Sequence, residues 1–329
     1  LEPDDTISIV TYAGRAGVAL EPTPVAEDGR IRAALASLGA AGSTAGAAGI
    51  NTAYRLAEDA FIEGGVNRVI LATDGDFNVG VTDPSALQRL VERKRETGVM
   101  LSVLGFGQGN LNDALMQTLA QNGNGTAAHI DTLAEARKVL VEEAGSTLYP
   151  IANDVKIQIE FNPAEIAESR LIGYETRALR REDFNHDRVD AGEIGAGHRV
   201  TALYEIARAG SAGRLVDPLR YGAAQVGAGS AETGELAFLK LRYKAPGEAT
   251  SRLITRPILD DGQTEPGAEA RWAAAVAGFG QLLRGGAHLG DWGFDEVIAL
   301  GEEAKGPDEW GYRAEFLTLV RLAKSLSQN

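Results

Sequence analysis

Residues 68–78 of this 329-residue chain read RVILATDGDFN, and this stretch decides the fold class. Residues 68–73 are a short, nearly continuous apolar run, which is typical of a parallel strand covered on both faces. The run ends at Asp74, and the glycine after it is a turn signal. A second buried strand is expected over 99–105, after a helix that begins at Pro84. Two buried strands joined through a helix predict a parallel sheet.

The same alternation continues on both sides of this stretch. Further strands are expected over 6–13, 17–20 and 127–131, and further helices over 28–38, 47–62, 112–121 and 132–145. The repeated strand–helix–strand order predicts an α/β fold over residues 1–147, with a doubly wound, mostly parallel sheet and helices on both faces.

The pattern changes after Pro150. Residues 154–161 (DVKIQIEF) alternate between apolar and polar, which predicts a half-exposed antiparallel strand with Ile157 on the apolar face and Lys156 on the polar face. Similar stretches recur further on and predict an antiparallel β-sheet or sandwich region over 148–262. Aromatic residues at helical spacing then predict a C-terminal helical segment over 263–329, where they form core.

Composition excludes several classes of function. The chain has 32 Lys and Arg against 46 Asp and Glu, a net charge of −14, so a nucleic-acid partner, which needs a basic patch, is not expected. It has no cysteine, which excludes disulfides, thiolate zinc sites and cysteine nucleophiles. No apolar run in this sequence approaches the roughly 18 residues of a membrane span.

Hydroxyl and carboxylate side chains follow the expected parallel strands. Ser43 and Thr44 lie in the glycine-rich loop 39–46, and Asp74 ends the strand over 68–73. Ligands of open α/β sheets bind at this carboxyl edge, and such hard oxygen donors suit Mg²⁺ or Mn²⁺. From the residues alone, a plain turn at Asp74 and a helix N-cap at Ser43 or Thr44 are the more common interpretations, and the cation site is the alternative.

Short sequence motifs in both halves of the chain resemble those of known families. The N-terminal half resembles a von Willebrand factor type A domain, and the C-terminal half resembles the region that follows this domain in bacterial YfbK-like proteins. The N-terminal likeness lies in residues 8–12 (SIVTY), 42–46 (GSTAG), 70–78 (ILATDGDFN) and 104–107 (LGFG), and the C-terminal likeness in residues 182–185 (EDFN), 190–198 (DAGEIGAGH) and 200–205 (VTALYE).

The resemblance implies a metal-ion-dependent adhesion site. In such domains an Asp-x-Ser-x-Ser motif after the first strand, a threonine in a second loop and an aspartate in a third hold the cation. Thr44 matches the second loop and Asp74 the third, with Ser43 and Asp76 as neighbours. The Asp-x-Ser-x-Ser motif matches nothing in this sequence. It is expected upstream of Leu1, on the strand that is central in the family's sheet.

The lack of an Asp-x-Ser-x-Ser motif in this sequence determines how tightly we expect it to bind a cation. Two oxygen donors, one of them neutral, are too few for Mg²⁺ or Mn²⁺, so this chain is expected to bind either ion weakly or not at all. In the complete site of the family, the open coordination position accepts an acidic side chain of a partner protein. The resemblance thus implies a non-enzymatic protein-binding module in the bacterial cell envelope or periplasm. The alternative is a structural or assembly factor of the envelope that binds through its C-terminal region without the cation.

A second acidic cluster consists of Asp183, Asn185, Asp187 and Asp190. Its first three members have the spacing of the first ligands of a calcium loop. An EF-hand is not expected, because the sixth position lacks the required glycine and the twelfth lacks the glutamate. A looser Ca²⁺ site and a solvated loop rich in Asx turns both stay open.

Enzyme motifs are incomplete or missing. Residues 105–110 (GFGQGN) follow a strand as a dinucleotide-binding loop would, but the sixth position is Asn110 where Gly or Ala is needed. The sequence contains no P-loop and no Gly-x-Ser-x-Gly elbow, and its four histidines are scattered. We therefore predict that the chain is not an enzyme.

Overall fold

Internal packing divides the chain into two compact units. The N-terminal unit comprises Leu1–Asn153, Gly192–His198 and Ala245–Glu248, and the C-terminal unit comprises Asp154–Ala191, Arg199–Lys244 and Ala249–Asn329. The predicted boundaries after residues 147 and 262 stay a prediction. The structure, a computed structural model, describes residues 1–12, 17–39, 46–74, 84–107, 111–143, 145, 150–174, 178–187, 189, 191–216, 234–260, 262 and 265–327.

The N-terminal unit alternates strands and helices in the predicted order. Its strands are β1 (Thr6–Thr11), β2 (Gly17–Pro24), β3 (Asn67–Thr73), β4 (Val99–Phe106), β5 (Ala127–Ile130), the start of β6 (Pro150–Phe161) and β8 (Ile194–Gly195). Its helices are α1 (Asp28–Ala36), α2 (Gly46–Asp59), α3 (Pro84–Arg95), α4 (Asp113–Asn122) and α5 (Leu133–Arg137), with single turns η1 (Val25–Glu27) and η2 (Lys138–Glu142). The Thr132 hydroxyl accepts the backbone N–H of Glu135 and caps α5, as the sequence predicts.

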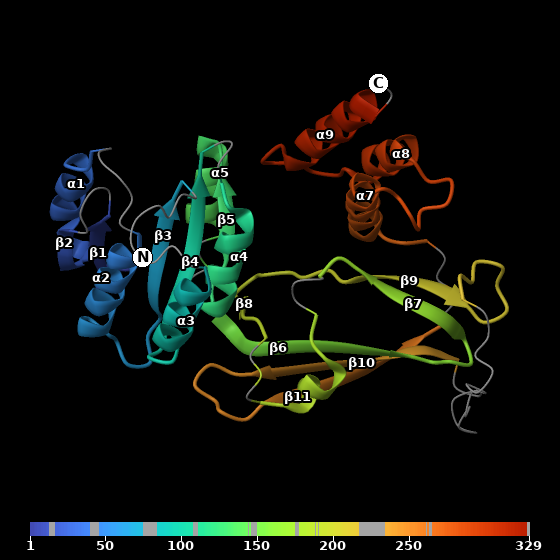
Figure 1. The fold of residues 1–329 in the computed structure, drawn as a ribbon, viewed down its shortest axis with the longest axis horizontal. Coiled ribbons are helices and arrows are strands. Elements are labelled where there is room, and N and C mark those ends of the chain that lie inside the picture. The colour runs from blue at the N-terminus through green and yellow to red at the C-terminus, as the bar shows by residue number, and fades with distance from the viewer. Residues whose placement is uncertain are drawn as a thin grey trace. The chain divides into compact units, whose positions relative to one another are not determined.

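Three of these strands form the predicted parallel sheet, in the order β3-β4-β5. Thr73 of β3 is level with Gly105 of β4, and Gly105 is level with His129 of β5. The carboxyl ends of the strands therefore lie at one edge. β1 and β2 form a separate antiparallel hairpin, and α2 packs against both β1 and β3 (Figure 1).

One face of the parallel sheet packs against α2, α3 and α4. The core between them is apolar and fully buried, with Ile50 and Tyr54 of α2, Val91 of α3 and Leu119 of α4 against Leu101 of β4. These buried residues lie at apolar positions of the helical and strand periodicity, so the core is the one that the sequence pattern predicts.

The opposite face of the sheet is covered only in part by the described residues. Leu104 and Ile130 pack against Val139 of η2 there. Ile70 of β3 is 47% exposed on the same face. The apolar run over 68–73 predicted a strand covered on both faces, and for Ile70 this prediction is wrong within the described part of the chain.

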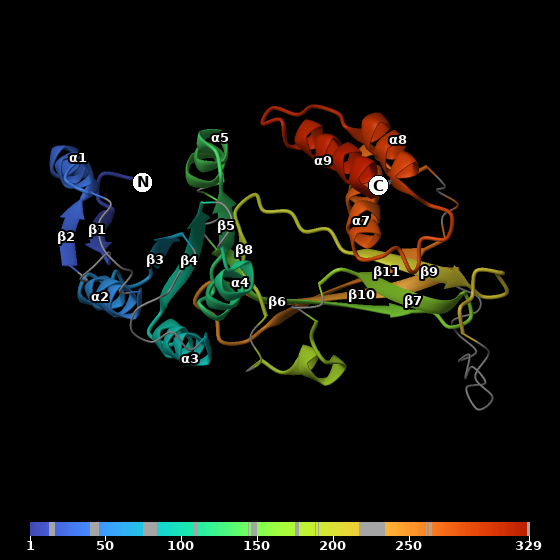
Figure 2. The same ribbon diagram turned by 45° about the horizontal axis from the view of Figure 1, so that its top comes forward.

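The C-terminal unit combines antiparallel strands with a helical bundle (Figure 2). Its elements are most of β6, β7 (Ile166–Ile172), η3 (Arg181–Asn185), β9 (Leu203–Arg208), β10 (Glu235–Lys244), β11 (Arg252–Leu259), α7 (Ala268–Leu283), α8 (Phe294–Ala304) and α9 (Tyr312–Ser327). β6, β10 and β11 lie in the order β11-β10-β6, and β7 pairs with β9.

The three C-terminal helices share one core. Ala275 of α7, Val297 of α8 and Val320 of α9 are fully buried, and the rings of Phe279 and Phe316 meet edge to face at 5.5 Å. The aromatic residues of this segment therefore form core, as their helical spacing predicts. Across the described residues, no helix is long and apolar enough to traverse a bilayer.

Lys156 is buried, in contrast to the prediction from strand alternation. The residue is 1% exposed, whereas Ile157 on the other face is 42% exposed. The Lys156 ammonium donates to the carbonyl of His186 at 2.7 Å and pairs with Asp154 at 3.2 Å. The alternation is correct, but the segment around His186 returns to cover the polar face.

Candidate functional site

Asp74 stands at the edge where the parallel strands end. It directly follows the buried Thr73 of β3, and its own side chain is exposed. Because Thr73 is level with Gly105, the ends of β3 and β4 share this edge. The carboxylate is thus a solvent-accessible oxygen donor at the position where open α/β sheets bind ligands.

Tyr12 ties the start of α2 to the end of β3. Its hydroxyl donates to the carbonyl of Ala72, one residue before the end of β3. Its side chain also lies against Gly49 in the first turn of α2, where an added Cβ would come within 2.5 Å of the Tyr12 Cβ. The first turn of α2 therefore lies at the same edge as Asp74. Sequence reasoning missed this role of Tyr12, whose only signal was its place near the end of the strand expected over 6–13.

The protonation of Tyr12 responds to this setting. Burial raises the pKa of the Tyr12 hydroxyl above its ordinary value, and the negative charge of Asp74 raises it further. A hydrogen bond with the Thr73 side chain acts in the opposite direction. The net effect keeps the phenol neutral, so it can donate to Ala72 at physiological pH.

The other residues predicted for the cation are not described. Ser43, Thr44 and Asp76 lie outside the described residues, so their predicted roles stay predictions. α2 begins at Gly46, two residues after Thr44. Within the described ranges, no three His, Cys, Asp or Glu side chains gather closely enough to hold a metal ion. Asp74 is a suitable ligand for Mg²⁺, but one carboxylate is not a site.

A gap in strand pairing lies beside this edge. In the described part of the chain, β1 pairs only with β2, and β3 pairs only with β4. The hydrogen bond from Tyr12 to Ala72 connects the two sheets, and α2 packs against both.

Two members of the second acidic cluster are already bonded within the protein. Asn185 accepts a hydrogen bond from Arg242 at 3.2 Å. Asp187 accepts from the Ser251 hydroxyl at 2.6 Å, and its backbone carbonyl accepts from Lys244 at the same distance. Asp190 lies outside the described residues, so the predicted Ca²⁺ site stays a prediction.

The hydrogen bond from Ser251 also affects the acidity of this loop. It holds the pKa of Asp187 below its ordinary value, and the charges of Lys244 and Arg242 act in the same direction. Two cationic side chains of β10, Arg242 and Lys244, thus already bond to this cluster.

Two protein families match the chain, one in each half. Residues 1–142 match the von Willebrand factor type A domain, and residues 146–326 match the family described as "Uncharacterized protein YfbK, C-terminal". The uncharacterized protein YfbK of Escherichia coli (strain K12) is 46% identical over 329 residues, which is 99% of this chain and 56% of that protein. Inter-alpha-trypsin inhibitor heavy chain H4 of Homo sapiens is 27% identical over 177 residues, covering 50% of this chain and 18% of that protein. The chain thus spans about half the length of the bacterial relative.

Similarity to solved structures is weaker. A von Willebrand factor type A protein from Catenulispora acidiphila is 16% identical with a TM-score of 0.48, covering 98% of this chain and 74% of that chain. The conserved hypothetical protein BatB from Bacteroides thetaiotaomicron is 23% identical with a TM-score of 0.35, covering 43% of this chain and 78% of that chain. The family matches and the strand order of the N-terminal unit therefore carry the assignment.

Proposed function

Because the chain belongs to the YfbK family and carries a von Willebrand factor type A domain, we propose that it is a non-enzymatic protein-binding module. Type A domains are protein-interaction modules, and the family resemblance that the sequence predicts is confirmed in both halves. The proposed recognition face is the edge formed by the end of β3, the end of β4 and the first turn of α2.

In this proposal a divalent cation is the centre of recognition. Thr44 and Asp74 would hold Mg²⁺ or Mn²⁺, with Ser43 and Asp76 as neighbours, and the ion would accept an acidic side chain of the partner protein. The supporting observation is the contact of Tyr12 with both Gly49 and Ala72, which brings the start of α2 beside Asp74. This chain alone supplies too few donors for tight binding, so the family's upstream motif is part of the proposal.

The proposed location is the bacterial cell envelope or periplasm. This part rests on the family resemblance and on no feature of the structure. The upstream sequence tests it, since a secretory or lipoprotein signal there would support export.

Calorimetric titration with Mn²⁺ tests the cation site. We expect weak or no binding to this chain and clear binding to a chain extended upstream through an Asp-x-Ser-x-Ser motif. In the extended chain, Asp74→Ala should weaken Mn²⁺ binding at least tenfold. Asp131→Ala is the matched control, because Asp131 is also exposed and follows β5 at the same edge of the sheet. Equal affinity of the two chains, or an unchanged affinity in Asp74→Ala, would contradict the proposal.

A structural or assembly factor that binds through its C-terminal region is the alternative. The observation that favours it is apolar surface in the C-terminal unit. All eight residues of β11 are exposed, and Leu319, Leu322 and Leu326 are exposed at helical spacing on α9. Capture of a partner from envelope extracts distinguishes the two. Capture that survives EDTA and Asp74→Ala, but is lost in Leu322→Glu, favours the alternative.

A further inference from the structure

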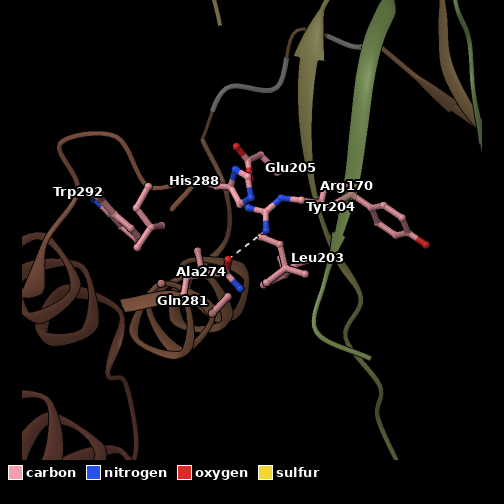
Figure 3. A pocket seen from close by; sticks show the side chains of 12 residues that line it. Arg170, Leu203, Tyr204, Glu205, Ala274, Gln281, His288 and Trp292 are labelled. Atoms are coloured by element: carbon pink, nitrogen blue, oxygen red, sulfur yellow. Dashed lines mark hydrogen bonds and ion pairs between the residues drawn. The ribbon is translucent and has the colours of Figure 1, made fainter. Parts of the chain in front are cut away.

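A pocket in the C-terminal unit lies apart from the proposed recognition face. It has a volume of about 330 Å³ and opens between the β7–β9 pair and α7 (Figure 3). This volume falls at the lower end of the range for small-ligand sites. All of its lining residues belong to the C-terminal unit.

The apolar wall of the pocket depends on small residues of α7. Ala274, Ala277 and Gly278 line it at helical spacing, and the indole of Trp292 packs over Gly278. A Cβ built on Gly278 would lie 2.1 Å from the Trp292 ring. The absence of a side chain at this position therefore lets the indole lie close against the helix and form one wall.

The polar end of the pocket is organised around Arg170. Its guanidinium donates to the Gln281 side-chain oxygen at 3.0 Å and to the Glu205 carboxylate. Figure 3 shows His288 and Glu205 beside this guanidinium, at the end of the pocket away from Trp292. Two contacts fix the guanidinium plane and use only part of its five N–H groups.

Hydrogen-bond donors outnumber acceptors at this end. The Gln281 amide nitrogen and the His288 ring have no hydrogen-bond partner among the described residues, and a neutral imidazole offers one donor and one acceptor. Arg170 retains further N–H groups, whereas Glu205 is already paired with Arg170. A ligand that complements this end must supply acceptor oxygens, and a carboxylate matches the guanidinium best.

We propose that this pocket binds an apolar carboxylate. The carboxylate lies on Arg170 and the Gln281 amide, and the hydrocarbon part lies against Trp292 and the small residues of α7. Two sources have this chemistry, namely a small free acid and the C-terminal residue of a peptide chain.

The test titrates the full chain with three probes. They are phenylacetate, the peptide acetyl-Gly-Gly-Phe with a free carboxylate, and the same peptide as its amide. The readout is the indole N–H signal of Trp292 in nitrogen–proton NMR spectra, one of three tryptophan signals, assigned with Trp292→Phe. We expect at least one acid to shift this signal with a Kd on the order of 1 mM. The amide should bind at least tenfold more weakly than its acid.

Variants locate the binding. Gly278→Ala should displace Trp292 and abolish the shift, whereas Gly280→Ala should leave it unchanged, since a Cβ there meets nothing within 4 Å. Arg170→Met should weaken binding at least tenfold, and it carries the test if Gly278→Ala fails to fold. Glu205→Gln should strengthen binding several-fold, because it removes the competing carboxylate.

Each outcome decides the proposal. Binding of phenylacetate alone identifies a small free acid, and binding of the peptide acid alone identifies a chain end. The proposal is overturned if neither acid shifts the Trp292 signal at 10 mM, if the amide binds as well as the acid, or if Gly278→Ala and Gly280→Ala weaken binding equally.

Discussion

Replacing Lys156 with methionine should destabilise the C-terminal unit by about 2–3 kcal/mol. The Lys156 side chain is fully buried and donates to the His186 carbonyl at 2.7 Å. Loss of a hydrogen bond from a charged donor costs about 1.5–3 kcal/mol. Breaking a buried ion pair costs about 3–5 kcal/mol when the other charge is left alone, but Asp154 keeps a second partner, Lys244, at 3.0 Å. Methionine has a similar volume and needs no desolvation, which offsets part of the loss.

Urea unfolding followed by tryptophan fluorescence measures this change. All three tryptophans lie in the C-terminal unit together with Lys156, so the signal reports on that unit. Lys240→Met is the matched control, because Lys240 pairs with Glu160 at 3.2 Å on the surface of the neighbouring strand. Exposed pairs contribute little, so the control should change the free energy of unfolding by about 0.5 kcal/mol or less.

The double variant Lys156→Met/Asp154→Asn tests whether the two residues act together. Asp154 has a positive φ of 52°, which asparagine tolerates, so the substitution leaves the backbone in place. The combined cost should fall short of the sum of the single costs by about 1 kcal/mol. The reasoning is refuted if Lys156→Met costs no more than Lys240→Met, or if the two single costs simply add.

Two further predictions concern the proposed recognition face and the acidic cluster. Gly49→Ala should cost about 1–3 kcal/mol in urea unfolding, because its Cβ would meet the Tyr12 side chain at 2.5 Å. Gly29→Ala is the control, because a Cβ on Gly29 of α1 would meet nothing within 4 Å. It should stabilise the protein by about 0.5–1 kcal/mol, and equal changes in the free energy of unfolding for the two variants would contradict the packing argument. Ser251→Ala should raise the pKa of Asp187 towards its ordinary value, as measured by NMR titration. The lowered folded-state pKa of Asp187 stabilises the protein above the unfolded pKa, and this stabilisation is lost as the pH falls through the folded-state pKa. The variant should therefore be less stable at neutral pH, and the difference should vanish once Asp187 is protonated in both proteins. A difference that persists in acid would point to another cause.

The sequence predicted the scaffold of the candidate site well. Buried strands such as β3 and β4 carry their signal in the apolar runs themselves, and parallel pairing then puts their carboxyl ends at one edge. Asp74 follows β3 directly, so its place at that edge could be predicted without coordinates.

The contacts around the site could not be predicted in the same way. Tyr12 and Gly49 are 37 positions apart in the chain, and no sequence pattern at either position predicts their contact. The role of Tyr12 depends on how α2 crosses the end of β1, which is a property of packing. The donors at Ser43, Thr44 and Asp76 rest on the family resemblance alone.

The sequence by itself determined the order of strands and helices, the family, and which side chains share a face of each strand. All three depend on the local spacing of residues and on short sequence motifs. Only the tertiary structure decided which face is covered. Lys156 and Ile157 alternate as predicted, yet the lysine is buried, because the segment around His186 folds back over the polar face and supplies a carbonyl, while Asp154 supplies a charge. The periodicity of a strand shows which side chains share a face. Whether that face is buried depends on which distant segment of the chain packs against it.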